Sequence, residues 1–220
     1  MGYPVQRVRE RTRHLLAWLA PDRCRSCDAP PFALCASCRS ALRPRPTVEV
    51  RPTLDLSAWV GIPSSEAVLA TLRELKRSGA RGLVQAVAPA LTALAEVNPA
   101  ALRADVLVIP PSRTVAYTER GFRPVELVAN AAGYQVLHAF RVRGGVRDQR
   151  GLSAPERSKN MRDPFELRPG FARQLNGARV LLLDDVLTTG ATLAALRASV
   201  LAAGGQIAGI WAISSVDGLR

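Results

Sequence analysis

Short apolar runs alternate with amphipathic stretches along most of this chain. The apolar runs lie at residues 58–62, 104–111, 180–183 and 207–213, and residues 134–142 alternate weakly. Continuous apolar runs are typical of strands buried on both faces of a parallel sheet. Between them, residues 66–77, 83–96 and 193–198 carry apolar side chains at helical spacing. The alternation of strands with helices predicts an α/β fold, with a parallel sheet flanked by helices.

One stretch combines these patterns with polar chemistry. The run at 180–183 leads through two carboxylates into the turn Thr188-Thr189-Gly190, and a helical pattern follows. A small-residue turn that opens a helix presents unpaired N–H groups, and the positive end of the helix dipole, to an anion. The hydroxyls of Thr188, Thr189 and Thr192 can donate to that anion, while Gly190 and Ala191 leave room for it to approach. The pattern predicts a phosphate site.

The two carboxylates, Asp184 and Asp185, are expected on the rim of this phosphate site. Carboxylates so close to a phosphate repel it unless they bind another part of the same ligand. Ribose hydroxyls and a Mg²⁺ ion are both suitable partners for carboxylate oxygens. The inferred ligand is therefore a sugar phosphate.

Residues 184–192, in which Val186 and Leu187 separate the acids from the turn, resemble the binding motif for 5-phosphoribosyl-1-pyrophosphate (PRPP) in type I phosphoribosyltransferases. In that family the two acids hold the ribose 2′ and 3′ hydroxyls, and the turn holds the 5′-phosphate. The resemblance implies a type I phosphoribosyltransferase-like sheet, a ligand site from Asp184 to Thr192, and Mg²⁺ as the ion that accompanies PRPP.

Two further segments suggest contacts with the pyrophosphate end of such a ligand. Arg113 and Arg120 follow the apolar run at 104–111, and the polar segment 143–160 contains Arg150, Arg157 and Lys159. A cationic flap can close over a pyrophosphate and neutralise the leaving group. The alternatives are solvated surface charges for the two arginines and a disordered surface loop for the segment.

The four cysteines of the chain form two close pairs, Cys24-x-x-Cys27 and Cys35-x-x-Cys38. Two such pairs can surround one tetrahedral Zn²⁺ ion, and four thiolate ligands leave no open position for chemistry. The alternatives are a redox-active dithiol or free thiols. We expect a small N-terminal zinc module at residues 1–42, a Pro-rich linker at 43–53 and a phosphoribosyltransferase-like domain at 54–220.

The chain of 220 residues has a formal net charge of +12, and Lys76 and Lys159 are its only lysines. A basic surface favours polyanionic partners, although an arginine-rich composition can also reflect the genome. The apolar runs are shorter than the roughly 18 residues of a membrane span, and the segment 15–20 is too short for the core of a signal peptide. We therefore expect a cytoplasmic protein without a membrane span.

The order of these pieces resembles the ComF family over residues 24–215. The pieces are the cysteine pairs, a helix that ends in Leu75-Lys76, the segment Arg120-Gly121-Phe122, residues 149–160 and residues 184–192. The resemblance implies a role in natural competence, with single-stranded DNA and DNA-uptake proteins as partners. Two hypotheses stay open: an enzyme that uses PRPP, and a non-catalytic protein that binds single-stranded DNA through the phosphate cradle and the basic loop.

Overall fold

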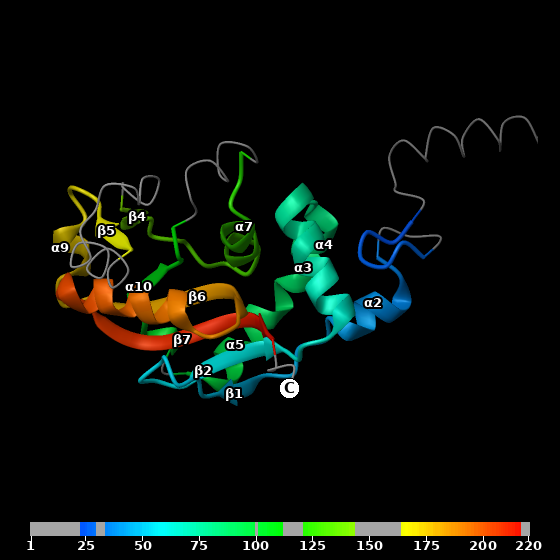
Figure 1. Ribbon diagram of the computed structural model, residues 1–220, viewed down its shortest axis with the longest axis horizontal. Coiled ribbons are helices and arrows are strands. Elements are labelled where there is room, and N and C mark those ends of the chain that lie inside the picture. Colours follow the sequence, from blue (N-terminus) through cyan, green and yellow to red (C-terminus); the bar gives the residue numbers. More distant parts are fainter. Residues whose placement is uncertain (1–22, 30–33, 100, 112–120, 144–163, 217–220) are drawn as a thin grey trace, which may run out of the picture.

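The computed structural model describes residues 23–29, 34–99, 101–111, 121–143 and 164–216 (Figure 1). Their elements, in chain order, are α2 (Ala36–Ala41), β1 (Thr47–Glu49), β2 (Ala58–Ile62), α3 (Glu66–Ser78), α4 (Arg81–Val87), α5 (Pro89–Val97), the short 3₁₀ helix η1 (Ala101–Arg103), β3 (Val106–Val108), α7 (Pro124–Ala131), β4 (Phe140–Val142), β5 (Phe165–Leu167), α9 (Ala172–Leu175), β6 (Arg179–Leu187), α10 (Ala191–Ala202) and β7 (Gln206–Ser215).

The main sheet has five strands in the order β1-β2-β7-β6-β3. The pairs β2–β7, β7–β6 and β6–β3 are parallel, and the edge strand β1 joins β2 antiparallel. Strands β4 and β5 form a separate antiparallel pair. The predicted α/β fold, a parallel sheet flanked by helices, is confirmed. The parallel strands end at one edge of the sheet, which is where ligands bind in open α/β folds.

Strand β6 is buried on both faces. Leu181 and Leu183 belong to one apolar core, which they share with residues of α3, α4, α5 and α7. Val180 and Leu182 belong to the other core, which lies beneath α10. Burial on both sides accounts for the uninterrupted apolar run of this strand. Asp184 is the first acidic side chain along the strand.

The helical pattern at 83–96 forms two helices rather than the single one that we expected. Helix α4 ends at Val87, and α5 begins with Pro89 at its first position. Proline suits a first helical turn because its missing N–H would have no partner there.

Within the described ranges, no helix combines the length and the apolar character needed to cross a bilayer.

Part of the segment that we expected to be a linker lies in the sheet. Residues 47–49 form β1, in which Val48 pairs with Trp59 of β2. Two prolines, Pro44 and Pro46, precede this strand. Proline is tolerated beside an edge strand, where one side of the backbone makes no ladder hydrogen bonds. The stretch from β1 to β2 is thereby held close to the carboxyl end of β6.

Candidate functional site

The acid pair lies inside strand β6 rather than after it. The strand continues past the acids to Leu187, where it still pairs with Ser215 of β7. The N–H of Asp185 donates to Asp184 Oδ1 at 2.8 Å. Pairing on the β7 side therefore fixes the main chain of both acids before the turn begins.

A lysine from a distant helix meets this acid pair. Lys76, in the last turn of α3, places its Nζ 2.6 Å from Asp185 Oδ2. The lysine side chain is 43% exposed and the aspartate side chain 15%, so the ion pair opens to solvent on the lysine side. The sequence alone is equally compatible with Lys76 as a cation that stabilises the end of a helix and with a ligand role. Its contact with Asp185 places it at the candidate site.

Burial and the neighbouring Asp185 raise the pKa of Asp184 from an ordinary 3.8 to about 7, although the Asp185 N–H and the charge of Lys76 oppose the shift. The side chain is half-buried beside a second carboxylate. The charge of Lys76 thus acts on both acids, although its ion pair is formed with Asp185. A group that brings hydroxyl donors or positive charge would stabilise the ionised pair.

Asp184→Asn is expected to stabilise the ligand-free protein at pH 8 but hardly at pH 4. Folding raises the pKa of this carboxyl group, so its contribution to the free energy of unfolding is most favourable below about pH 4. That contribution is lost as the pH rises from about 4 to about 7. A shift from 3.8 to about 7 corresponds to about 4 kcal/mol, or roughly 10 °C in Tm for a chain of this length. Asparagine keeps an oxygen for the Asp185 N–H. Thermal unfolding of both proteins from pH 4 to pH 8 measures the difference, and a gain in Tm that is the same at every pH would contradict it.

The turn between β6 and α10 needs glycine at residue 190. Gly190 has φ of +83°, in the left-handed region that disfavours other residues. A Cβ atom on Gly190 would lie 2.9 Å from Thr53 Oγ1 and 3.0 Å from Leu54 Cγ. The N–H of Ala191 donates to Thr189 Oγ1 at 3.3 Å within the turn, and Gly190 is the N-cap of α10.

Residues 51–53 hold the carbonyl groups of this turn. Arg51 Nε donates to the carbonyl oxygen of Thr188 at 2.8 Å, and the Thr53 hydroxyl donates to that of Thr189. In a trans peptide the N–H points away from the carbonyl of the same unit. The N–H groups of Thr189 and Gly190 therefore point away from residues 51–53. This orientation, together with the start of α10, is what a phosphate cradle requires.

A short network extends this bracing to β1 and β7. Arg51 also forms an ion pair with Glu49, whose second oxygen accepts from Ser215 Oγ at 2.6 Å. No local pattern indicated this role, because Arg51 and Thr53 stand in a segment with the composition of a linker. The bracing depends on β1, because this strand carries Glu49 and ends just before Arg51.

The residues expected at the pyrophosphate lie outside the described ranges. They are Arg113, Arg120, Arg150, Arg157 and Lys159. The structure does describe Phe122, which follows Arg120 closely. Its ring lies against Gly79, the left-handed C-cap of α3, where a Cβ would be 2.9 Å from the ring. Phe122 therefore packs at the end of the helix that carries Lys76.

The four cysteines come together as the sequence predicts. Sulfur atoms of Cys24, Cys27, Cys35 and Cys38 all lie within 4.8 Å of one another. Tetrahedral zinc with Zn–S bonds of ~2.3 Å has its sulfurs ~3.8 Å apart, and the Cys27–Cys35 sulfur distance is 3.6 Å. The four-cysteine cluster therefore fits a zinc ion.

Main-chain groups favour the thiolate form of Cys24, whereas burial raises the pKa of Cys38 to about 12. The N–H of Cys35 donates to Cys24 Sγ and that of Cys38 to Cys35 Sγ, both at 3.4 Å. Burial raises the pKa of the Cys24 thiol, but hydrogen bonds from the main chain at Cys35, Ser26 and Cys27 outweigh it and lower the pKa to about 6. Zinc binds the thiolate form.

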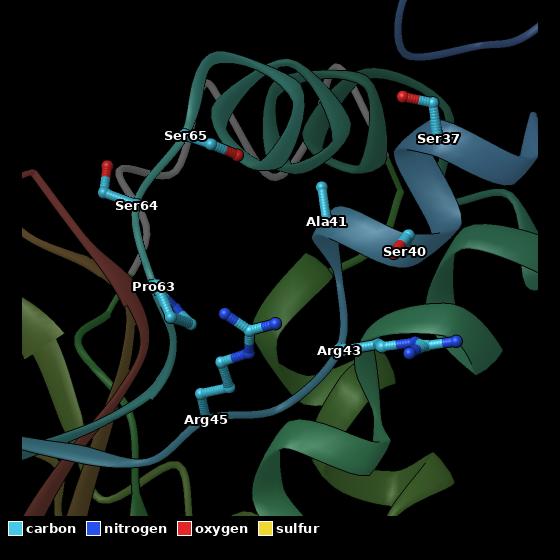
Figure 2. Close-up of a pocket in the computed structure, with 8 residues that line it drawn as sticks. All are labelled: Ser37, Ser40, Ala41, Arg43, Arg45, Pro63, Ser64 and Ser65. Carbon is cyan, nitrogen blue, oxygen red and sulfur yellow. The ribbon is translucent and has the colours of Figure 1, made fainter.

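An open pocket of about 520 Å³ lies between α2 and the start of α3 (Figure 2). Figure 2 shows the Arg45 guanidinium between Pro63 and Ala41, with Arg43 extending away from it. Four serines complete its polar lining, which contains no acidic side chain. Neither arginine side chain forms a hydrogen bond or an ion pair with the described parts of the chain. The pocket contains no residue of the acid pair or of the turn.

No protein-family model matches this chain, and no curated protein matches it in sequence. Among solved structures, it is similar to adenine phosphoribosyltransferase from Saccharomyces cerevisiae, with 18% identity, 84% of this chain and 92% of that chain covered, and a TM-score of 0.42.

Two further structures are similar to the chain. One is APRTase from Giardia lamblia, with 18% identity, 78% of this chain and 94% of that chain covered, and a TM-score of 0.40. The other is orotate phosphoribosyltransferase from Mycobacterium tuberculosis H37Rv, with 16% identity, 81% and 94% covered, and a TM-score of 0.32.

Proposed function

We propose that this protein is phosphoribosyltransferase-like and binds PRPP, or a related ribose phosphate, together with Mg²⁺. The proposal is supported by one observation: a carboxylate pair and a turn whose carbonyl groups are held by Arg51 and Thr53 lie at the same end of one strand. Asp184 and Asp185 offer acceptors for ribose hydroxyls, and the turn at 188–190 offers N–H donors. A sugar phosphate is the ligand that carries both complementary groups.

The acid pair fits a magnesium ion that arrives with the ligand. Mg²⁺ prefers carboxylate and phosphate oxygens and keeps several waters, so one or two carboxylates suffice on the protein side. Asp184 has no cationic side chain of its own among the described residues, since the Lys76 ion pair is formed with Asp185. Bound Mg²⁺ would supply charge neutralisation at the pyrophosphate of PRPP.

As an enzyme, the protein would transfer the phosphoribosyl group to a nucleophile while pyrophosphate leaves C1 of the ribose. Asp184 and Asp185 would hold the sugar rather than act as general bases. Arg113, Arg120 and the basic segment with Arg150, Arg157 and Lys159 are proposed to neutralise the leaving group. Positioning and charge neutralisation would supply most of the rate enhancement, with a transition state of oxocarbenium character.

Single-stranded DNA is a second candidate ligand, and the pocket of Figure 2 favours it. Arg43 and Arg45 are exposed, unpaired within the described residues and surrounded by hydroxyl groups. An open cationic surface of this kind suits a backbone phosphate. Together with the ComF resemblance, it supports the proposal that the protein handles incoming DNA in the cytoplasm during natural competence.

Calorimetric titration with PRPP, with and without Mg²⁺, tests the first proposal. We expect saturable 1:1 binding that strengthens with Mg²⁺, and weaker binding of ribose 5-phosphate and of pyrophosphate alone. An absence of PRPP binding by the folded, metal-replete protein would overturn the proposal.

The DNA candidate is tested by the fluorescence anisotropy of a labelled oligothymidylate, titrated with the protein at low and at high salt. An affinity that falls steeply with salt supports the DNA candidate.

A further inference from the structure

The turn formed by Cys24 and Cys27 is docked on helix α3. Ser26, inside this turn, donates through Oγ to the carbonyl oxygen of Ala67 at 2.9 Å and lies 2.8 Å from Thr71 Oγ1. Arg25 Nη1 lies 3.4 Å from Glu74 Oε1. Both residues between the two cysteines therefore contact the helix. Thr71 is fully buried at this contact.

The docking residues and Lys76 occupy different stripes of the same helix. At about 100° per residue, Ala67, Thr71 and Glu74 form one stripe. The next stripe holds Val68, Leu72 and Leu75, all buried in the core that also contains Cys24 and Cys38. Lys76 follows on the far side of this apolar stripe. The cysteine turn and Asp185 therefore lie against opposite flanks of α3.

Helix α3 is suited to connect the two flanks. Ser65 caps its start by accepting from the Val68 N–H at 3.2 Å, and Gly79 ends it in the left-handed conformation. The helix has 13 residues and buries its apolar stripe completely. A rotation or shift that loosens the Ser26 contacts would also move Lys76, since both lie on one capped helix.

We infer that the four-cysteine cluster is a positioning element of the phosphoribosyl site, acting through α3 on Lys76. Metal bound by the four cysteines fixes the turn that holds Arg25 and Ser26. This turn fixes the helix, and the helix holds the ammonium group of Lys76 at Asp185. The inference rests on the proposed function for its ligand, but the link from the turn to the acid pair exists without a ligand.

The link can be broken while the cysteines stay intact. The docking variant Arg25→Gln/Ser26→Ala removes both side-chain contacts with α3. The control variant Arg39→Gln/Ser57→Ala makes the same two changes at exposed positions, whose side chains form no hydrogen bond or ion pair among the described residues. All variants are compared at equal zinc content. Lys76→Met and its combination with the docking variant complete a double-mutant cycle.

The first readout needs no ligand. Hydrogen exchange of the peptide that covers residues 183–192 should be faster in the docking variant than in the wild type, and unchanged in the control. In the Lys76→Met background, the docking changes should add little, because the link is already broken. Equal exchange in the docking and control variants would overturn the inference.

The second readout is affinity for PRPP with Mg²⁺. The docking variant should bind about 5-fold more weakly than the control, Lys76→Met should bind more weakly still, and Lys76→Arg should restore most of the loss. Fully additive effects of the docking changes and Lys76→Met would show that the turn does not act through Lys76. If no variant and no wild type binds PRPP, the proposed function fails, and the exchange measurement alone decides the inference.

Discussion

Asp184→Asn/Asp185→Asn is expected to reduce the affinity for PRPP with Mg²⁺ by roughly 100-fold or more. Each carboxylate is proposed to make a charge-assisted contact with ribose hydroxyls or with the ion, and a hydrogen bond to a charged group contributes ~1.5–3 kcal/mol. Two such losses take a Kd of about 1 µM to about 0.1 mM or weaker. The fold should survive, because asparagine keeps the shape of each side chain and Lys76, left unpaired, is 43% exposed.

The matched control is Glu66→Gln/Glu96→Gln, which removes the same number of negative charges at exposed positions whose side chains form no ion pair among the described residues. This control should bind PRPP like the wild type. If only the loss of negative charge mattered, both double variants would bind the anionic ligand more tightly than the wild type. Unchanged PRPP affinity in the Asp184/Asp185 variant, with circular dichroism like that of the wild type, would show that the acid pair does not hold the ligand.

The sequence predicts the central strand well because its signals are contiguous. The apolar run, the two acids and the Thr-Thr-Gly turn follow one another, so local pattern alone places them at one strand end. The structure extends β6 through both acids to Leu187, since pairing with β7 continues past the last aliphatic residue. The boundary was missed because carboxylates are unusual inside a buried strand.

The side chains that complete the site are not local and carry no pattern. Lys76 reaches Asp185 from α3, and Arg51 and Thr53 reach the turn from the segment between β1 and β2. Each contact joins positions far apart in the chain, so it depends on how the elements pack. Strand β1 has only three residues, too few to show a period of two. A composition rich in proline therefore suggested a linker.

Metal removal from the four-cysteine cluster is expected to destabilise more than the N-terminal turn. Cys24 and Cys38 are each 2% exposed and belong to the same core as Leu72 and Leu75 of α3. Without a metal, the buried sulfurs lose the ion that holds them together, and the turn loses its fixed shape. Structural zinc contributes ~10–16 kcal/mol in small zinc-finger peptides. Even a loss of several kcal/mol would lower Tm by roughly 10 °C or more.

The four ligands should differ in their effects, because their burial differs. Cys38→Ser places a polar group in the core and removes a ligand, whereas Cys27→Ser changes an exposed ligand that water can replace. We therefore expect the zinc stoichiometry and the Tm to fall further for Cys38→Ser than for Cys27→Ser. A chelator should lower the Tm of the wild type to about that of Cys38→Ser. Differential scanning fluorimetry with metal analysis measures both. If chelators left the Tm unchanged and thiol reductants lowered it, the cluster would be a dithiol pair. A redox-active cluster is stabilised by its disulfide, whereas a zinc cluster is stabilised by its metal.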